Sequence, residues 1–231
     1  MTDTVSISTA ASAVAGAVGA DGLSGLVNNA GIVVPGPIEF LPLPELRRQL
    51  EINVVGQVAV TQAFLPLIRT GRGRIVNMGS ISGRMATPFT GAYGASKFAL
   101  EALTDALRLE LAPWGISVSI IEPGAVATPI WDKVEAIDSS RAASTPYGPA
   151  LAVVKDFSIA MGRRGFPPEK IGGVVLKALT AAKPRTRYTV TPDALRFRLM
   201  MALPKRMVDR LIAKRLGFTV RGVAKHAPRQ G

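Results

Sequence analysis

The sequence predicts an α/β fold built on a doubly wound parallel sheet. Short apolar runs at 23–28, 74–79, 116–122 and 187–190 have the length of buried strands. Helical segments separate these runs, and this alternation is typical of a parallel sheet with right-handed crossovers. With 48% hydrophobic residues, the 231-residue chain is expected to form one domain, residues 1–231, with a sizeable core.

The helical segments carry recognisable start and stop signals. Residues 4–19 present a face of small residues and end among glycines. Pro44 and Glu45 are typical of a first helical turn, so we expect a helix from there to about residue 69. The segment 91–111 has helical periodicity, and the proline and glycine that follow it indicate its end.

The second half of the chain shows weaker periodicity. Residues 129–166 mix Trp, Ser, Pro and charged residues, and we expect an irregular lid there. Another helix is predicted from Pro168 to about Ala182. Residues 193–216 are predicted to form two basic amphipathic helices split at Pro204. These helices either cap a substrate pocket or rest on a membrane surface, and capping is the favoured interpretation.

Composition argues against several classes of protein. The chain has no cysteine, which rules out a disulfide framework and is consistent with a reducing cytosol, so we expect a cytoplasmic protein. Its single histidine, His226, cannot form a cluster, and no metal site is expected. The apolar runs are short and interrupted, and the first twenty residues lack signal-peptide features. No membrane span or leader is therefore predicted.

The basic charge lies mainly near the C-terminus. Of a formal net charge of +12, most comes from residues 184–231, which hold twelve Lys or Arg against two Asp; the rest holds sixteen against fourteen acidic residues. Basic segments of this kind bind nucleic acid or anionic lipid. No nucleic-acid motif is present, so no nucleic-acid partner is expected. A soluble basic tail is favoured over peripheral membrane contact.

One stretch brings three chemically active side chains together. Tyr93 and Lys97 are four residues apart on a predicted helix, so they lie on the same face. An ammonium beside a phenol is expected to lower the pKa of the phenol, which could then donate and accept protons near neutral pH. Ser80 ends the preceding strand and could hold a carbonyl oxygen. The alternative is a surface tyrosine beside a solvated lysine.

Five motifs in a fixed order carry a resemblance to a known family. They are NNAG at 28–31, Asn53 in INVVG, Ser80, Tyr93 with Ala95, Ser96 and Lys97, and PGAVAT at 123–128. Over residues 20–130 their order and spacing resemble the short-chain dehydrogenase/reductases (SDR). GSISGR at 79–84 and IEPG at 121–124 are similar to the retinol, steroid and hydroxybutyrate dehydrogenase branch. The resemblance implies a Rossmann-like fold and hydride transfer between an alcohol or carbonyl and a nicotinamide cofactor, NAD or NADP.

The resemblance also implies roles for individual residues. Tyr93 is the expected general acid/base, Lys97 lowers its pKa, Ser80 polarises the substrate oxygen, and Asn53 holds a water in a proton relay. A structural Asn53, bonded to neighbouring backbone, is an equally weighted alternative. The implied cofactor-binding residues are Asn28, Ala30, Gly31, Tyr93, Lys97, Pro123, Gly124 and Thr128, and Ser80 and Tyr93 contact substrate. The expected substrate is a lipophilic alcohol or carbonyl.

The family's phosphate-binding turn is absent. No G-x-G-x-x-G or T-G-x-x-x-G-x-G stretch follows a strand. We therefore expect an N-terminally truncated Rossmann-like sheet without its first three strands, about 60 residues in two overlapping βαβ units. Met1 would then mark an internal start, and the strand at 23–28 would be an exposed edge prone to self-association.

Two functional classes follow. The first is an NAD(P)-dependent oxidoreductase, expected to be a homo-oligomer because the two long helices at 45–69 and 91–111 commonly pair across a dimer axis in this family. The second is a truncated, non-catalytic relative that acts as an interaction or dimerisation protein. Cofactor binding separates them.

Overall fold

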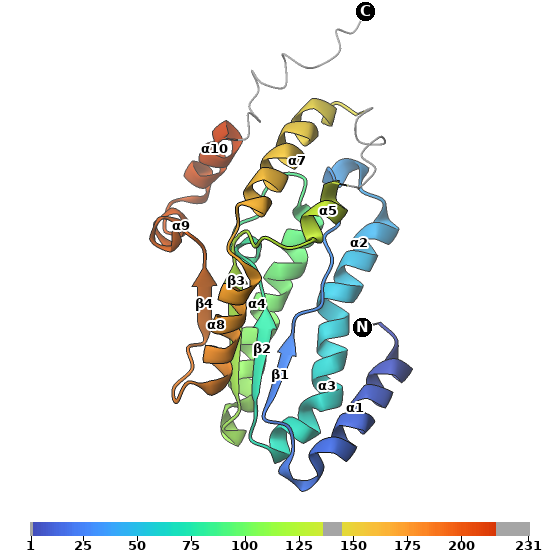
Figure 1. Cartoon of the computed structure of the whole chain (residues 1–231). Coiled ribbons are helices and arrows are strands. Elements are labelled where there is room, and N and C mark those ends of the chain that lie inside the picture. The colour runs from blue at the N-terminus through green and yellow to red at the C-terminus, as the bar shows by residue number, and fades with distance from the viewer. Residues whose placement is uncertain (1, 136–144, 216–231) are drawn as a thin grey trace, which may run out of the picture.

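Four parallel strands form the centre of the molecule. The computed structural model describes residues 2–135 and 145–215. Its strands are β1 (Gly25–Asn28), β2 (Arg74–Met78), β3 (Ser117–Pro123) and β4 (Arg187–Val190), in the order β1-β2-β3-β4 (Figure 1). All three pairings are parallel. The expected Rossmann-like parallel sheet is confirmed, and β1 is its edge strand as expected.

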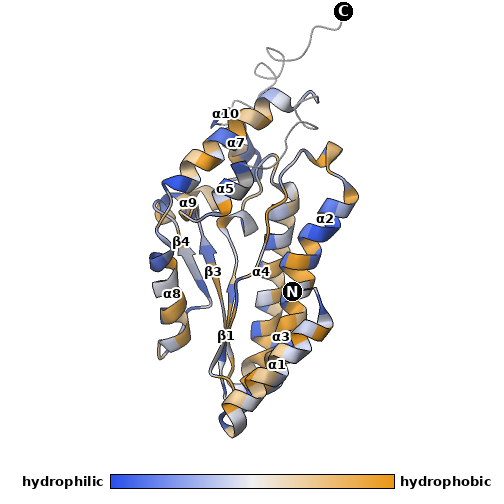
Figure 2. Ribbon diagram, turned by 45° about the vertical axis from the view of Figure 1, so that its right-hand side comes forward, coloured by the Kyte–Doolittle hydropathy of each residue, from blue (hydrophilic) through white to orange (hydrophobic). Residues whose placement is uncertain are grey.

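Apolar side chains of alternating strand residues build a core on each face of the sheet. On one face Ile75 and Val118 pack with α3 (Gly56–Thr70) and α4 (Gly91–Leu111). On the other, Val76 and Ile121 pack with α8 (Pro168–Thr180). Hydrophobic residues gather on the strands and on the helix sides that face them (Figure 2). Buried alternation of this kind fixes the register, because a one-residue slip would reverse the two faces.

The last crossover differs in hand from the first two. The strand order runs in one direction, yet α3 and α4 lie on one face and α8 lies on the other. The connection from β3 to β4 through α8 therefore has the opposite hand from the connections through α3 and α4. The expectation of right-handed crossovers is therefore wrong for the connection from β3 to β4.

The N-terminal helix α1 (Thr4–Val18) packs beside α3. Asp3 caps it by accepting hydrogen bonds from the backbone N–H groups of Val5 and Ser6. Gly19 and Gly22 end it with positive φ values of 52° and 68°. The helix agrees with the predicted range 4–19 and with the predicted stop at the glycines, whereas the Asp3 cap was not part of the prediction.

A long helix with a polar inner face follows β1. It comprises α2 (Leu43–Leu50), a π-helical turn (Glu51–Val55) and α3. By length and composition alone, Leu43–Thr70 is long and apolar enough to cross a membrane, a candidate that the sequence prediction did not name. Its fully buried side chains include three amides, Gln49, Asn53 and Gln57, as well as Ile68 in the core. The first half of the long helix therefore turns a polar face into the domain, and the second half turns an apolar face toward the sheet.

The segment after β3 contains helices that periodicity did not reveal. Residues 129–166 were expected to be irregular, but α5 (Ile130–Glu135) and α7 (Gly148–Arg163) lie there. Residues 136–144 of this expected lid, and residue 216 and His226, are outside the described residues. The two C-terminal helices, α9 (Ala194–Met201) and α10 (Lys205–Arg215), flank Pro204 as predicted.

Candidate active site

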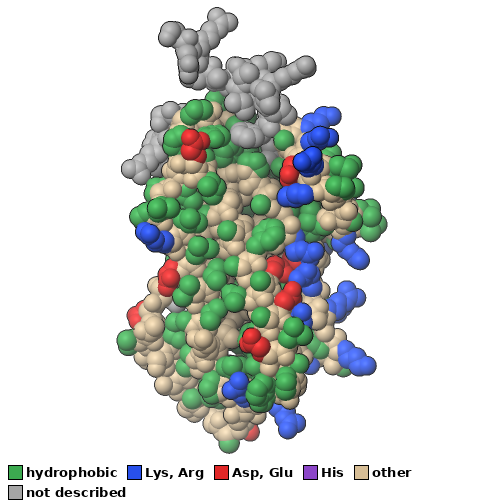
Figure 3. Space-filling model, turned by 180° about the vertical axis from the view of Figure 1, so that it is seen from behind, with side chains coloured by type: hydrophobic (Ala, Val, Ile, Leu, Met, Phe, Trp, Pro, Cys, Tyr) green, Lys and Arg blue, Asp and Glu red, His purple; other side chains and the backbone are tan. Residues whose placement is uncertain are grey.

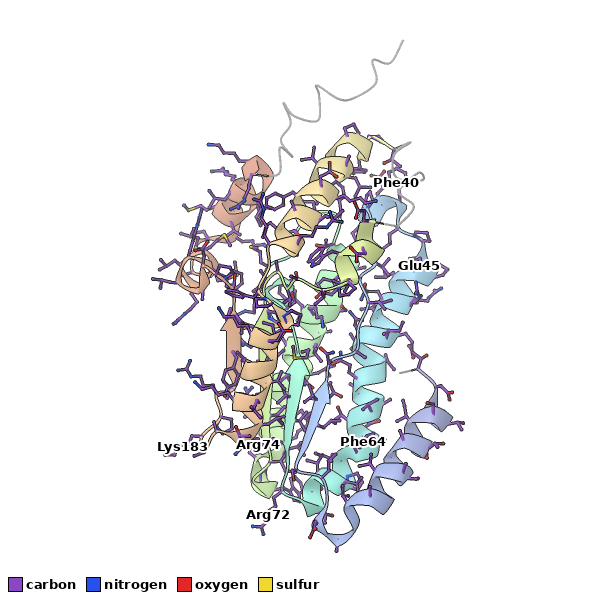
Figure 4. All side chains as sticks on the ribbon, viewed as in Figure 1. Phe40, Glu45, Phe64, Arg72, Arg74 and Lys183 are labelled. Carbon is purple, nitrogen blue, oxygen red and sulfur yellow. The ribbon has the colours of Figure 1, made fainter. Side chains whose placement is uncertain are left out.

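A large cavity opens at the carboxyl ends of the strands, where ligands bind in open α/β sheets. Its volume is about 1920 Å³, and its walls are mainly apolar. Phe40 and Glu45, at the α2 end of the molecule, belong to its lining, whereas Arg74 and Lys183 lie at the opposite end (Figure 4). Helices α7, α9 and α10 form the far wall, so the cavity lies between the sheet and the C-terminal elements.

Tyr93, Lys97 and Ser80 line this cavity together. Tyr93 and Lys97 come from α4, and Ser80 follows β2 and caps the short 3-10 turn Ile81–Gly83 through its hydroxyl, which accepts from Ser82 N at 3.1 Å. The Lys97 Nζ lies 5.7 Å from the centre of the Tyr93 ring. Ser80 and Lys97 are buried and Tyr93 is half-buried, which argues against a surface tyrosine beside a solvated lysine.

The pKa of Tyr93 is shifted in the direction opposite to the expectation. Burial raises it above the ordinary phenol value, and hydrogen bonding by the Ser80 side chain opposes this shift. The Lys97 ammonium, which was expected to lower this pKa, donates to the Met78 carbonyl at 2.7 Å. The phenol is therefore protonated at neutral pH and is suited to donating a proton.

Lys97 is itself strongly affected by burial. Desolvation lowers its pKa to about 8, and the nearby carboxylate of Glu101 acts to raise it. Lys97 and Glu101 are four residues apart on α4, so they lie on one side of the helix. The ammonium remains protonated at neutral pH, but its proton is held less firmly than that of a surface lysine.

Behind Lys97 lies a buried cluster of charged side chains. Arg187 Nη2 donates to Glu101 Oε2 at 2.6 Å, and Arg187 Nε lies 3.1 Å from Glu122 Oε1. Thr189 Oγ1 donates to Glu122 Oε2 at 2.6 Å. Burial first, and then repulsion by Glu122, raise the pKa of Glu101, while Arg187 opposes the shift. The cluster connects α4 to β3 and β4 immediately beside the lysine.

Three amides hold the loop that follows β1. Gln49, Asn53 and Gln57 recur every four residues and so share one face of the helix. Gln49 accepts from Val34 N at 2.7 Å and donates to Ile32 O at 2.9 Å, and Gln57 donates to Ala30 O at 3.0 Å. This row of amides, named here the amide ladder, fixes residues 30–34. The sequence prediction included only Asn53 and missed the two glutamines, although their spacing was visible.

Asn53 joins this loop to helix α4, which carries Tyr93 and Lys97. Its Oδ1 accepts from Ile32 N at 2.8 Å, and its Nδ2 donates to Ile32 O at 3.0 Å and to Ser96 Oγ at 3.1 Å. Ser96 in turn donates to the Tyr93 carbonyl at 2.7 Å. These contacts favour the interpretation of Asn53 as a structural residue bonded to backbone. Ser96 therefore links the Asn53 side chain to the backbone of Tyr93.

Asn28 ties strands and helices together through its side-chain amide. It faces Asn77 in the register of β1 and β2 and donates to Asn77 Oδ1 at 2.9 Å and to Thr61 Oγ1 at 2.8 Å. Asn77 donates onward to Thr104 Oγ1 at 2.8 Å. This buried chain of hydrogen bonds spans α3, β1, β2 and α4, and so fixes α4 and its tyrosine against the sheet.

Most of the predicted site residues share the cavity. The lining includes Gly31, Ser80, Tyr93, Lys97, Pro123, Gly124 and Thr128. Asn28, Ala30 and Asn53 lie behind it, where they hold the sheet and the loop. A Cβ on Gly124 would approach Thr191 Oγ1 to 3.1 Å, so glycine suits the close approach of the segments that follow β3 and β4.

The described residues fit the nicotinamide half of a dinucleotide. Residues of the loops after β1 and β3 line the same cavity as Tyr93 and Lys97. No glycine-rich turn between a strand and a helix occurs within 2–135 or 145–215, so these residues provide no phosphate cradle of the Rossmann type. In those same ranges, no group of three His, Cys, Asp or Glu could hold a metal ion.

Aromatic side chains connect α7 to the loops over the cavity. Tyr147 precedes α7, and its ring lies edge-on to Phe40 and to Phe89, each at 6.0 Å. The Tyr147 hydroxyl donates to Glu39 Oε2 at 2.8 Å. Phe89 has a φ of 64°, which is strained for a residue with a side chain, and packs with α7. This contact closes the cavity above α4.

A parallel sheet with a tyrosine, a lysine and a serine at the carboxyl ends of its strands defines the class as nicotinamide-dependent oxidoreductases. The model of the short chain dehydrogenase family matches residues 1–138, and the chain belongs to that family.

Named relatives support the branch that the sequence indicated. An NADPH-dependent 3-dehydrocapnine reductase from Ornithobacterium rhinotracheale is 40% identical over 205 residues, which cover 86% of this chain and 72% of the reductase. Retinol dehydrogenase 5 from Mus musculus is 40% identical over 212 residues, covering 84% of this chain and 65% of that enzyme. The chain thus spans about two thirds of the length of the mouse relative.

The fold is shared with solved structures. The structure of an NAD+-bound xylitol dehydrogenase matches with a TM-score of 0.69 and 29% identity, covering 82% of this chain and 75% of the xylitol dehydrogenase. The retinol dehydrogenase branch and the Rossmann-like fold are therefore confirmed. Relatives and neighbours are named with NADPH and with NAD+, which agrees with the prediction of NAD or NADP.

Proposed function

We propose that this chain carries the site at which an alcohol and a carbonyl are interconverted with NAD or NADP. The observation that supports this most is the convergence of the Ser80 hydroxyl, the Tyr93 phenol and the Lys97 ammonium on one buried cavity wall. Two independent elements, the end of β2 and the start of α4, bring them there. Buried polar groups of this kind, aimed into a cavity, are typical of reactive sites.

Each residue has a distinct part in the proposed reaction. Tyr93 donates its proton to the substrate oxygen during reduction and accepts it during oxidation. Ser80 holds that oxygen by a hydrogen bond, and Lys97 provides a positive charge that favours the phenolate left behind. The nicotinamide, when bound, supplies or accepts the hydride. Asn53 positions Tyr93 through Ser96, and we keep a water relay beyond Lys97 as part of the proposal.

The cofactor contacts follow from the cavity lining. Gly31, Pro123, Gly124 and Thr128 flank the Tyr93–Lys97 face and would hold the nicotinamide end. Asn28 and Ala30 would support the cofactor site indirectly. Asn28 would hold the strands through its bond to Asn77, and Ala30 would hold the loop through its bond to Gln57 of the amide ladder. The mainly apolar walls suit a lipophilic substrate. Retinol dehydrogenases and a dehydrocapnine reductase among the relatives are in keeping with that class.

The experiment combines cofactor binding with turnover. Titration of the chain with NADH and with NADPH, followed by nicotinamide fluorescence, measures binding. Turnover is then screened on lipophilic alcohols and ketones. We expect Tyr93→Phe to abolish turnover, because the phenylalanine fills the space without supplying a proton, while circular dichroism stays unchanged. Turnover that survives in Tyr93→Phe would refute the proposed role.

A homo-oligomer formed through α3 and α4 is a second part of the proposal. Large apolar side chains are exposed on this side, among them Val55, Phe98, Leu103 and Leu109. Because the amide ladder faces inward, the apolar side of the long helix is left for a partner. A non-catalytic dimerisation protein would use the same surface. Light scattering after size exclusion measures the oligomeric state, and the cofactor titration then separates the enzyme from the dimerisation protein. A dimer that binds no nicotinamide favours the non-catalytic dimerisation protein.

The proposed compartment is the cytoplasm, because the chain contains no cysteine and nothing in its composition requires an oxidising environment. Association with a membrane surface is compatible with that assignment, and it is argued separately from the C-terminal helices.

A further inference from the structure

Helices α9 and α10 carry a row of exposed large apolar side chains. The row recurs at every fourth residue and continues across Pro204. Its members and their exposed fractions are Leu195 (69%), Leu199 (63%), Leu203 (37%), Met207 (47%) and Leu211 (50%). A surface helix normally turns its apolar stripe toward the core, so an exposed stripe of this length indicates an interaction surface.

The inner side of the same helices is anchored to the domain. Phe197 and Val208 are buried. Ile212 packs against the cluster of Phe89, Leu151 and Val154 beneath α7. The two helices are therefore held in place by apolar contacts of their own. The exposed row is additional to those contacts and is not needed for docking the helices onto the domain.

Positive charge accompanies the row. Residues 193–215 contain seven Lys or Arg: Arg196, Arg198, Lys205, Arg206, Arg210, Lys214 and Arg215. The acidic residues in this range are Asp193 and Asp209. Within the described part of these helices, one salt bridge forms, between Lys205 and Asp209 at 3.3 Å. Seen from behind, Lys and Arg gather along the edge that holds α9 and α10, with hydrophobic side chains among them (Figure 3).

The row also borders the cavity. Leu199, Leu203 and Leu211 belong to the cavity lining, whereas Leu195 and Met207 do not. The exposed surface and the site of Tyr93 therefore border the same cavity, whose lining from these helices also includes the charged residues Asp193, Arg196, Lys214 and Arg215.

We propose that α9 and α10 form a docking surface for an anionic membrane, from which a lipophilic substrate enters the cavity. The part concerning substrate entry rests on the proposed function. An interfacial helix places apolar residues in the headgroup region and basic residues against anionic lipid. The exposed apolar row meets the first requirement, and the seven Lys and Arg of residues 193–215 meet the second.

Charge favours a membrane over a second copy of the chain. Two copies joined through this surface would bring their excess positive charges together, which disfavours association. Anionic lipid is complementary to the surface, and the attraction is screened by salt. The choice between these occupants can therefore be tested through lipid charge and ionic strength.

The experiment is sedimentation of the full chain with phosphatidylcholine vesicles, with and without phosphatidylglycerol. We expect at least tenfold tighter binding when the anionic lipid is present, and a marked loss at high salt. The double variant Leu195→Ser, Met207→Ser should lose most of this binding. The double variant Arg206→Gln, Arg210→Gln should also lose most of its binding to the anionic vesicles. These residues are exposed, so thermal unfolding should remain close to that of the wild type.

Matched controls lie away from the surface. Leu176→Ser removes a comparably exposed leucine from α8, and Lys183→Gln removes an exposed cation at the opposite end of the molecule (Figure 4). Both should bind vesicles as the wild type does. Equal binding to neutral and anionic vesicles, no binding to either, or equal losses in the controls would overturn the proposal. Self-association that Leu195→Ser, Met207→Ser abolishes would assign the surface to a second copy instead.

The proposed oxidoreductase site and the proposed docking surface can be contradicted independently. Vesicle binding requires neither cofactor nor turnover, and the nicotinamide titration requires no lipid. A chain that binds nicotinamide but not anionic vesicles would contradict the docking surface alone. A chain that binds vesicles but no nicotinamide would contradict the proposed function and with it substrate entry, leaving the docking surface in place.

Discussion

The ammonium of Lys97 donates a hydrogen bond to the backbone carbonyl of Met78, at 2.7 Å, where β2 ends. This bond ties the catalytic helix to the strand that leads to Ser80. It also places a buried positive charge beside the phenol of Tyr93, 5.7 Å from the ring centre. Strand, helix and charge are thus fixed relative to one another before any ligand arrives, as a reactive site requires.

Burial of Lys97 predicts a pH-dependent stability. Its folded pKa of about 8 lies below the unfolded value of 10.5, so the unfolded chain binds more protons between these values. The contribution of Lys97 to the free energy of unfolding is therefore complete above pH 10.5 and is lost as the pH falls through 8, by about 3 kcal/mol. Urea unfolding of the wild type and of Lys97→Met between pH 8 and 10.5 measures how the difference in their free energies of unfolding depends on pH. A constant difference between the two proteins would contradict a desolvated ammonium.

Glu101 predicts the opposite dependence at lower pH. Burial and repulsion by Glu122 raise its pKa from 4.5 to about 8, so the folded chain holds a proton that the unfolded chain releases. The stability that this provides is complete below pH 4.5 and is lost as the pH rises through 8. The difference in unfolding free energy between the wild type and Glu101→Gln should therefore fall steadily across that window. A difference that rises with pH would mean that Glu101 is an ordinary ion-paired carboxylate.

The amide ladder is expected to contribute directly to stability. Gln49→Leu keeps a similar volume but leaves Val34 N–H without its acceptor, whereas Ile32 C=O keeps its hydrogen bond from Asn53 Nδ2. Burying one such unpaired N–H costs about 1–3 kcal/mol. Gln62→Leu, at an exposed position of the same long helix, serves as the control and should change the free energy of unfolding by less than about 0.5 kcal/mol. Equal urea midpoints for the two variants would show that the ladder is not stabilising.

The contact between α5 and α7 can be tested at a glycine. A Cβ added to Gly162 would overlap the Trp131 ring, whose Nε1 donates to Val126 O at 2.7 Å. Gly162→Ala should therefore displace the indole and change its fluorescence, and it should lower the thermal unfolding temperature. Gly173→Ala on α8 meets nothing within 4 Å and is the matched control. An unchanged tryptophan spectrum in Gly162→Ala would mean that α5 and α7 do not pack in this way.

Local signals in the sequence were sufficient for most of the fold. The strand Arg74–Met78 and the helix Gly91–Leu111 lie where periodicity and the flanking glycines predicted them. The grouping of Ser80, Tyr93 and Lys97 was also predicted, because a strand end and a helix start are adjacent in any such crossover. These features depend on residues close together in the chain.

Features that depend on distant residues were missed. The pKa of Tyr93 rises because the rest of the domain buries it, which helical spacing cannot reveal. Arg187 lies 86 residues from Glu101, its hydrogen-bond partner, so the charged cluster has no local signature. Gln49 and Gln57 were overlooked because buried amides interrupt an apolar pattern. The helix α7 was missed because its packing partners, such as Phe89, come from other elements.

The central claim is that the chain holds the nicotinamide end of the cofactor against Tyr93 and Lys97. Reduced nicotinamide mononucleotide tests it most directly, because this half-cofactor needs no site for the adenosine half. We expect saturable enhancement of its fluorescence with the wild type, at least tenfold weaker binding by Lys97→Met, and unchanged binding by Gly173→Ala. Equal binding by Lys97→Met and wild type, or no binding by a folded wild-type chain, would contradict the account.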